Sequence, residues 1–251
     1  MEIIAICNQK GGVGKSTTAE NLLAGLHSKG YKVLGIDLDA QRNLSFTTGA
    51  STEGATILGV LTNEVDINKA IQHTHSGDII ASNRSLSGAD AFISETGKEY
   101  RLREALEKLE GEYQYCIIDT PPALGILTTN ALTACRRVVI PAQADIYSLQ
   151  GIEELYETTK TIKKYCNPAL TIEGILLTRY SQRAILSREV AEQAELLADK
   201  IGTKVFKAMI REAVVVKESQ LSQASLFSYA PKANVTKDYE LFIQELIGEE
   251  K

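Results

Sequence analysis

One stretch decides the fold of this 251-residue chain: Asn8-Gln9-Lys10-Gly11-Gly12-Val13-Gly14-Lys15-Ser16-Thr17. It follows a short apolar run, residues 3–7, and it precedes a helical pattern. A strand, a glycine-rich loop and the start of a helix together present backbone amides to a phosphate group. The order therefore predicts a site for a nucleoside triphosphate. The alternative is a glycine-rich turn that binds nothing.

The side chains of this loop have separate roles in such a site. We expect Lys15 to reach the β and γ phosphates and the Ser16 hydroxyl to bind Mg²⁺. Thr17, one step into the helix, is placed to contact the α phosphate. One lysine is enough to neutralise the phosphate oxygens, so the second lysine of the loop, Lys10, needs another role.

Composition and pattern favour an ordinary α/β protein. Hydrophobic residues make up 44% of the chain and charged residues 24%, which is typical of a globular protein. Short apolar runs alternate with helical patterns, which predicts a mainly parallel, twisted sheet flanked by helices in one domain, residues 1–251. Strands are predicted at residues 3–7, 32–37, 78–81, 113–119, 137–141, 170–178 and 204–208, and helices at 16–29, 101–109, 149–165, 187–200 and 235–246.

Charge and cysteine usage narrow the class of protein. The formal net charge of −5 gives no general attraction to nucleic acid or to acidic lipid, so any such contact must be local. The sequence has no apolar run of membrane-spanning length and no signal peptide pattern. Its four cysteines lie far apart, so we expect structural thiols in a reducing cytoplasm.

Carboxylates stand at the ends of two predicted strands. Asp119 ends the strand at 113–119, where it can hold Mg²⁺ through water or cap the next turn. Asp37 ends the strand at 32–37 and Asp39 follows two positions later, so the two point the same way if the strand continues. We expect Asp39 to orient the attacking water. Asp37 is a candidate for a second acid at the metal or for an acid that organises the loop.

With these motifs the chain resembles the ParA-type partition ATPases, in the superfamily that includes MinD and the nitrogenase iron protein. The loop matches the deviant Walker A pattern K-G-G-x-G-K-[ST], a variant of the P-loop of NTPases. Residues 37–41 resemble the D-x-D-P-Q segment, with Ala40 in place of proline. Residues 119–122 resemble D-x-P-P, and residues 138–143 resemble V-x-I-P-x-Q.

The resemblance implies an activity, cofactors and partners. It implies slow ATP hydrolysis with Mg²⁺ as a cofactor, and an ATP-sandwich homodimer in which Lys10 reaches the phosphates of the partner subunit. It places Asp39 at the catalytic position. It also implies nonspecific DNA binding on the nucleoid in the cytoplasm, no membrane contact, and a ParB-like centromere-binding adaptor that stimulates hydrolysis.

The DNA contacts implied by the resemblance are only partly present. Arg183 matches an arginine that the family uses for DNA, whereas Val215 replaces another, and Lys217 is its candidate substitute. Residues 179–217 hold eight basic side chains against five acidic ones, so a solvated helix face is the alternative. Arg211 and Ala213 replace the proline and asparagine associated with the adenine pocket.

A second function remains open at this point. A MinD-like or cargo-positioning ATPase that does not act on DNA would use the same loop, and the acidic pI of about 5.4 favours it. Asn8 and Gln9 match the N-Q-K-G-G of ParA-type loops rather than the G-K-G-G of MinD. Residues 247–251 form no basic amphipathic helix, which also counts against MinD.

Overall fold

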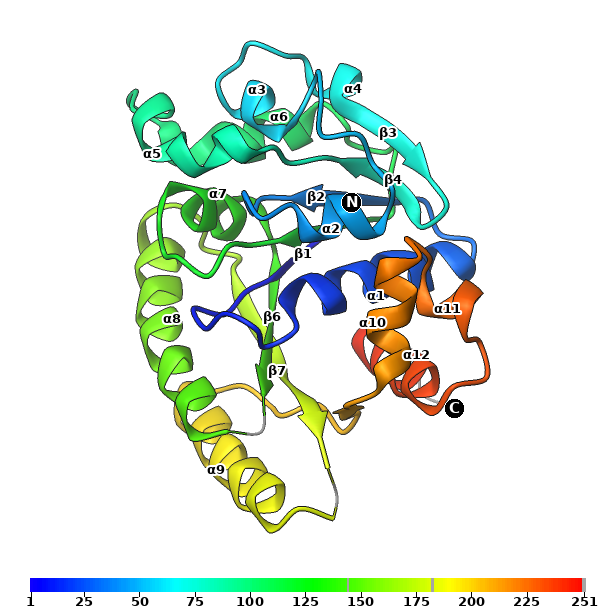
Figure 1. The fold of residues 1–251 in the computed structure, drawn as a ribbon. Coiled ribbons are helices and arrows are strands. Elements are labelled where there is room, and N and C mark those ends of the chain that lie inside the picture. The colour runs from blue at the N-terminus through cyan, green and yellow to red at the C-terminus, as the bar shows by residue number, and fades with distance from the viewer. Residues whose placement is uncertain (144, 182, 250–251) are drawn as a thin grey trace.

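The computed structural model describes residues 1–143, 145–181 and 183–249, apart from the side chains of residues 146, 147 and 150. An eight-stranded sheet runs through it in the order β3-β4-β2-β5-β1-β6-β7-β8 (Figure 1). Only the β3–β4 pair is antiparallel. The strands are β1 Glu2–Ile6, β2 Val33–Asp37, β3 Ile71–Thr74, β4 Gly77–Ile80, β5 Tyr115–Asp119, β6 Arg137–Gln143, β7 Thr171–Tyr180 and β8 Ile210–Arg211.

Helices cover both faces of the sheet, as continuous apolar strands require. One face packs against α1 and the C-terminal helices, and the other against helices from the middle of the chain (Figure 1). The first group is α1 Lys15–Ser28, α2 Asn43–Thr47, α10 Val214–Leu221, α11 Leu226–Tyr229 and α12 Asn234–Ile247. The second is α3 Ile57–Leu61, α4 Ile67–Ala70, η1 Arg84–Gly88, α5 Ala89–Phe92, η2 Lys98–Tyr100, α6 Arg101–Glu107, α7 Ile126–Ala134, α8 Ile146–Tyr165 and α9 Ile185–Ile201. The predicted α/β class is confirmed.

The structure differs from the predicted elements in several places, and strand β3 and short helices such as α2, α3 and α4 were not predicted. The strand expected at 204–208 is wrong: only Val205 bridges to the sheet, at Ile175, and the last strand is β8. Helix α7 was not predicted because nearly all of it is buried, so its sequence has no polar face. Helix α10 was not predicted because it begins with three valines, a run typical of strands.

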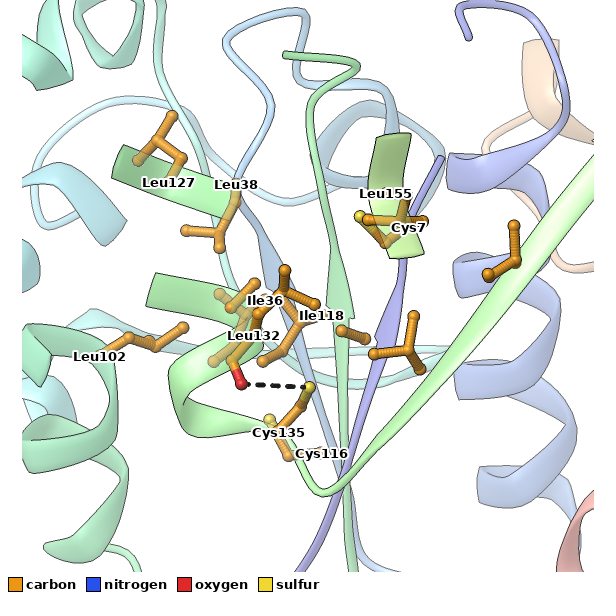
Figure 2. Packing of buried hydrophobic residues seen from close by; sticks show 14 of the residues in the cluster. Cys7, Ile36, Leu38, Leu102, Cys116, Ile118, Leu127, Leu132, Cys135 and Leu155 are labelled. Atoms are coloured by element: carbon orange, nitrogen blue, oxygen red, sulfur yellow. Dashed lines mark hydrogen bonds between the residues drawn. The ribbon is translucent and has the colours of Figure 1, made fainter. Parts of the chain in front are cut away.

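The cysteines take part in packing. All four are reduced thiols, and Cys7, Cys116 and Cys135 are buried among apolar side chains of β2, β5, α7 and α8 (Figure 2). Burial raises the pKa of Cys7 to about 11, and it raises the pKa of Cys116 and Cys135 further. These three thiols therefore stay protonated and behave as small apolar groups, as predicted.

The structure describes only part of the C-terminal segment that was compared with MinD. Helix α12 ends at Ile247, and Gly248 caps it in a left-handed conformation with φ of 76°. Glu250 and Lys251, which belong to the tail compared with MinD above, lie outside the described residues. In the part of the chain that the structure describes, no helix combines the length and apolarity needed to cross a bilayer.

Glu20 is an acidic residue buried in the apolar core. It lies on the buried face of α1 with 3% of its surface exposed, and its Oε1 has no hydrogen-bond partner among the described residues. Burial raises the pKa of this carboxyl to about 8. The folded protein therefore holds a proton on Glu20 that the unfolded chain releases above pH 4.5. The stability from this group is present below that pH and is lost as the pH rises to about 8.

Substitution of Glu20 tests this assignment. Because Gln cannot ionise, Glu20→Gln should raise the free energy of unfolding at pH 8.5 by about 1–3 kcal/mol and change it little at pH 4.5. Urea unfolding at several pH values measures both. Glu154→Gln, an exposed acid on α8, is the matched control. Equal pH dependence in the wild type and Glu20→Gln would contradict the assignment.

Candidate functional site

Parallel pairing brings three strand ends together. The register of the sheet places Asp119 beside Ile6 of β1 on one side and beside Asp37 of β2 on the other. The glycine-rich loop leaves β1 at this level, and α1 follows it. The loop, Asp37 and Asp119 therefore meet at the carboxyl ends of the strands, where open α/β sheets bind ligands.

The loop itself is held by its glycines and by hydrogen bonds to its neighbours. Gly12 and Gly14 have φ of 78° and 90°, a conformation that favours glycine. The Asn8 side chain donates to the carbonyl of Pro141 over 2.7 Å and accepts from the Lys10 amide over 3.0 Å. Asn8 therefore ties the start of the loop to the end of β6.

The far side of the loop is tied to β7. Thr178 donates its hydroxyl to the carbonyl of Val13 over 2.8 Å. A Cβ at Gly14 would lie 3.7 Å from the Thr178 methyl carbon, so space would be adequate and only the positive φ requires glycine. The loop is thus fixed between β6 and β7 before any ligand arrives.

Lys15 is a buried cation. Only 7% of its surface is exposed, and its Nζ donates to the carbonyl of Lys10 over 3.0 Å. Burial lowers the pKa of Lys15, while the nearby Asp119 opposes this shift. An ammonium group kept out of water in this way is a strong binding partner for an anion that enters the loop.

Asp119 has the properties of a metal-binding acid. It is fully buried, and neither carboxylate oxygen accepts a hydrogen bond from the described residues. Burial and the neighbouring Asp37 raise its pKa well above the ordinary value, while the nearby Ser16 hydroxyl and Lys15 partly offset this shift. Mg²⁺ prefers carboxylate, hydroxyl and phosphate oxygens and keeps several waters. Ser16 and Asp119 fit such an ion, since it would satisfy the buried oxygens of Asp119.

Asp37 is already fully engaged by its own chain. One of its oxygens accepts from the Asp39 amide over 3.0 Å, and the other accepts from the amide and hydroxyl of Ser45 at 2.8 and 2.7 Å. Burial raises its pKa to about 6. This geometry favours the role of a loop-organising acid over that of a second metal ligand.

Asp39 is largely buried, with 9% of its surface exposed, but it lines a cleft. Its Oδ1 accepts from the amide of Gln41 over 2.9 Å, and the residue lines the same cleft as Lys15 and Ser16. A carboxylate in that position can accept a hydrogen bond from a water molecule near a bound phosphate.

Lys10 is paired within its own chain. Its Nζ donates to Asp145 over 2.5 Å, and both side chains are about 30% exposed. Asp145 also caps α8, where it accepts from the amide and hydroxyl of Ser148. Burial raises the pKa of Asp145, but the hydrogen bonds from Lys10 and Ser148 outweigh it and hold the pKa below its usual range.

The cleft above the loop has a volume of about 580 Å³. A smaller cavity of about 110 Å³ adjoins it, since Gly14 and Thr17 line both. The cleft is lined by loop residues and Asp39 together with side chains not assigned to a site from sequence: Gln41, Asn43, Phe46, Thr47, Pro122, Arg179, Gln220 and Leu221.

The two candidate DNA residues lie apart. Lys217 is on α10 and lines both the cleft and the smaller cavity, next to the candidate phosphate site. Arg183 is exposed in the turn before α9 and lines neither of them. Four exposed positions of α9 are acidic, Glu189, Glu192, Glu195 and Asp199, and two are basic, Arg188 and Lys200.

Sequence reasoning missed Asp145 and Arg179. Asp145 follows the end of β6, so the rule that ligands gather at carboxyl strand ends could have indicated it. Its contact with Lys10 spans 135 positions, which no local pattern predicts. Arg179 follows the buried run of β7 and had been counted only among basic residues.

Comparison with known proteins agrees with this site. Residues 1–172 match a family model described as an AAA domain. The chain is 36% identical to the chromosome partitioning protein ParA of Caulobacter vibrioides, a match that covers 100% of this chain and 96% of that protein. It is 38% identical to the sporulation initiation inhibitor protein Soj of Bacillus subtilis, with 95% of each covered.

Solved structures give the same result. Cobyrinic acid a,c-diamide synthase from Mycobacterium smegmatis, with bound ATP analogue and magnesium, is 31% identical with a TM-score of 0.86, covering 98% of this chain and 94% of that one. A McdA variant from Cyanothece in complex with ATP is 25% identical with a TM-score of 0.87, covering 100% and 98%. The chain belongs to the ParA and MinD-type ATPases with a deviant Walker A loop, as the resemblance in its sequence predicted.

Proposed function

We propose that this protein is a single-domain, Mg²⁺-dependent ATPase in which residues 1–251 form one switch for DNA partition. The observation that carries the proposal is the buried cation of Lys15, which lines the cleft, with the buried carboxylate of Asp119 close enough to affect its pKa. A triphosphate in the loop would pair with Lys15, and its Mg²⁺ would satisfy the orphaned oxygens of Asp119. Relatives solved with an ATP analogue and magnesium support this ligand.

The residues around the cleft divide the work of hydrolysis. The amides of residues 11–17 bind the phosphates, with Lys15 as their counter-charge and Ser16 as the hydroxyl ligand. Mg²⁺ in this site would neutralise charge on the β and γ phosphates. Asp39 accepts a hydrogen bond from the attacking water and orients it toward the γ phosphate. We expect this hydrolysis to be slow, as the resemblance to the family implies.

Lys10 distinguishes the two states of the switch, the free monomer and the ATP-bound dimer. In the structure it is held by Asp145 of its own chain. When two ATP-bound copies meet face to face, Lys10 exchanges this carboxylate for the more highly charged triphosphate of the partner subunit. ATP thereby closes a homodimer, and hydrolysis returns Lys10 to Asp145.

The relatives favour DNA as the surface on which the dimer acts. One of them, ParA of Caulobacter vibrioides, is named a chromosome partitioning protein, and its match covers the whole of this chain. Arg183 supplies an exposed cation for a phosphate contact. We place the protein in the cytoplasm at the nucleoid, with a ParB-like centromere-binding adaptor that stimulates hydrolysis and so releases DNA.

The alternative is a cargo-positioning ATPase without a DNA step. The exposed acids of α9 favour it, because Glu189 and Glu192 lie near Arg183 in the chain and would repel a DNA backbone. The placement of Lys217 at the cleft also favours it, since this removes one of the two candidate DNA contacts. A DNA-binding assay separates the two functions.

Asp39→Ala tests the role in hydrolysis. The variant should bind ATP normally and hydrolyse it about a hundredfold more slowly, because the water loses its hydrogen-bond acceptor. Calorimetry gives the affinity and phosphate release gives the rate. Asp199→Ala, an exposed acid of α9, is the control. Unchanged turnover in Asp39→Ala would remove this residue from the mechanism.

Asp145→Asn tests the exchange of Lys10. Asn keeps the helix cap but loses the charge that holds Lys10, so the ATP-dependent dimer should form at about two- to fivefold lower protein concentration. Lys10→Ala should bind ATP as a monomer and fail to dimerise. Light scattering with ATP measures both variants. Dimerisation by Lys10→Ala at the wild-type concentration would contradict the exchange.

Arg183→Glu tests the contact with DNA. With ATP present, the affinity for DNA of arbitrary sequence should fall, and the slope of log affinity against log salt should decrease by about 1 for each lost phosphate contact. Arg103→Glu on α6 is the charge-matched control. If the wild type with ATP does not bind DNA at low salt, the partition function fails and the cargo-positioning alternative stands.

A further inference from the structure

Two cations besides Lys15 face the nucleotide site. Arg179 and Lys217 line both the 580 Å³ cleft and the adjoining 110 Å³ cavity. They come from separate elements, the end of β7 and the middle of α10. Gly14 and Thr17 also line both spaces, so the two meet beside the first turn of α1. A ligand whose phosphates occupy the loop would pass these cations where it leaves the cleft.

The backbone at Arg179 is unusual. Its φ is 49°, a left-handed conformation that is uncommon for residues other than glycine, asparagine and aspartate. The pairing of β7 with β8 shifts register here, so that Thr178 lies opposite Ile210 and Tyr180 opposite Arg211. Arg179 is thus the extra residue of a β-bulge. Bulges redirect a side chain, and strained backbone at such a position is a sign of a functional constraint.

The bulge directs Arg179 toward the ligand site. The residue before it, Thr178, is the one that holds the phosphate loop through the carbonyl of Val13. In a regular strand, the side chain after Thr178 would point away from that loop, because side chains alternate between faces. At its left-handed position, the exposed Arg179 lines the cleft instead.

The smaller cavity has the character of a site for the nucleoside end. Its walls include Val216, Tyr239 and the chain around Ala213. The Gln220 amide donates to the Thr17 hydroxyl over 3.0 Å, which ties α10 to the start of α1. Arg211 is held by Asp238 in a bidentate ion pair at 2.6 and 2.8 Å, so its guanidinium is directed to a carboxylate. Among the described residues that line this cavity, Arg179 and Lys217 are the cations that form no ion pair.

We propose that Arg179 and Lys217 bind the nucleotide itself, at the junction between its phosphates and its nucleoside. Arg179 contacts the α phosphate and the nucleoside with its planar guanidinium, which can hydrogen-bond and stack at the same time. Lys217 supplies a point charge from α10 to the same phosphate. This inference rests on the proposed function, and it assigns Lys217 to the nucleotide rather than to DNA.

Arg179→Gly separates binding from structure. Glycine adopts a left-handed φ without strain, so the ligand-free variant should melt within about 2 °C of the wild type. It lacks the guanidinium, so its affinity for ATP should fall about tenfold in calorimetry. Arg188→Ala, an exposed arginine on α9, should leave both quantities unchanged. Lys217→Ala should also bind ATP more weakly.

The outcomes are distinguishable. If the wild type fails to bind ATP, the proposed function itself is wrong. If the wild type binds and Arg179→Gly binds equally well, the role of Arg179 is overturned. A clearly lower melting temperature of ligand-free Arg179→Gly would also overturn it, since the side chain would then be structural. Normal ATP affinity of Lys217→Ala, with weaker DNA binding, would return Lys217 to the DNA surface.

Discussion

The site depends on one electrostatic arrangement, a buried ammonium group beside buried carboxylates. Lys15 is the first residue of α1 and Asp119 is the last residue of β5, and both are buried away from water. Burial lowers the pKa of the lysine and raises that of the aspartate, so each charge is costly in the ligand-free protein. A triphosphate with its metal ion supplies an anion to the first and a cation to the second. Nucleotide binding therefore offsets the cost of burying these two charges.

The same arrangement explains why the loop is fixed from several sides. Asn8 ties it to β6, and Thr178 ties it to β7. Asp37 organises the segment that carries Asp39 through three hydrogen bonds. The backbone amides are then already in place when the phosphates arrive, which lowers the cost of ordering the site on binding. The ion pair of Lys10 and Asp145 is partly exposed, and in the proposed function it is the contact that exchanges partners.

Much of this could be predicted from sequence, because the decisive signals are local. The loop lies between a buried strand and a helix, and Asp37 and Asp119 each end a run of buried apolar residues. Where packing rather than the local pattern decides the secondary structure, the sequence did not predict it. The run at 204–208 is apolar enough for a strand, but the ring of Phe206 packs on Gly174 and the sheet resumes only at Ile210.

The missed site residues have a shared physical cause. Asp145 meets Lys10 only because β6 lies beside β1, and Arg179 enters the cleft only because β7 has a bulge. Lys217 is a candidate for DNA because it lies near Val215, where the family has an arginine, and the packing of α10 near the loop brings it to the cleft as well. Contacts between distant segments follow from topology and not from spacing along the chain.

The most direct test of the central claim is a crystal structure of the protein with Mg²⁺ and a nonhydrolysable ATP analogue. The account predicts that the triphosphate lies in the loop of residues 10–17 and contacts Lys15. It also predicts that the metal ion lies between Ser16 and Asp119. A triphosphate bound away from Lys15, or a metal ion remote from both Ser16 and Asp119, would contradict it.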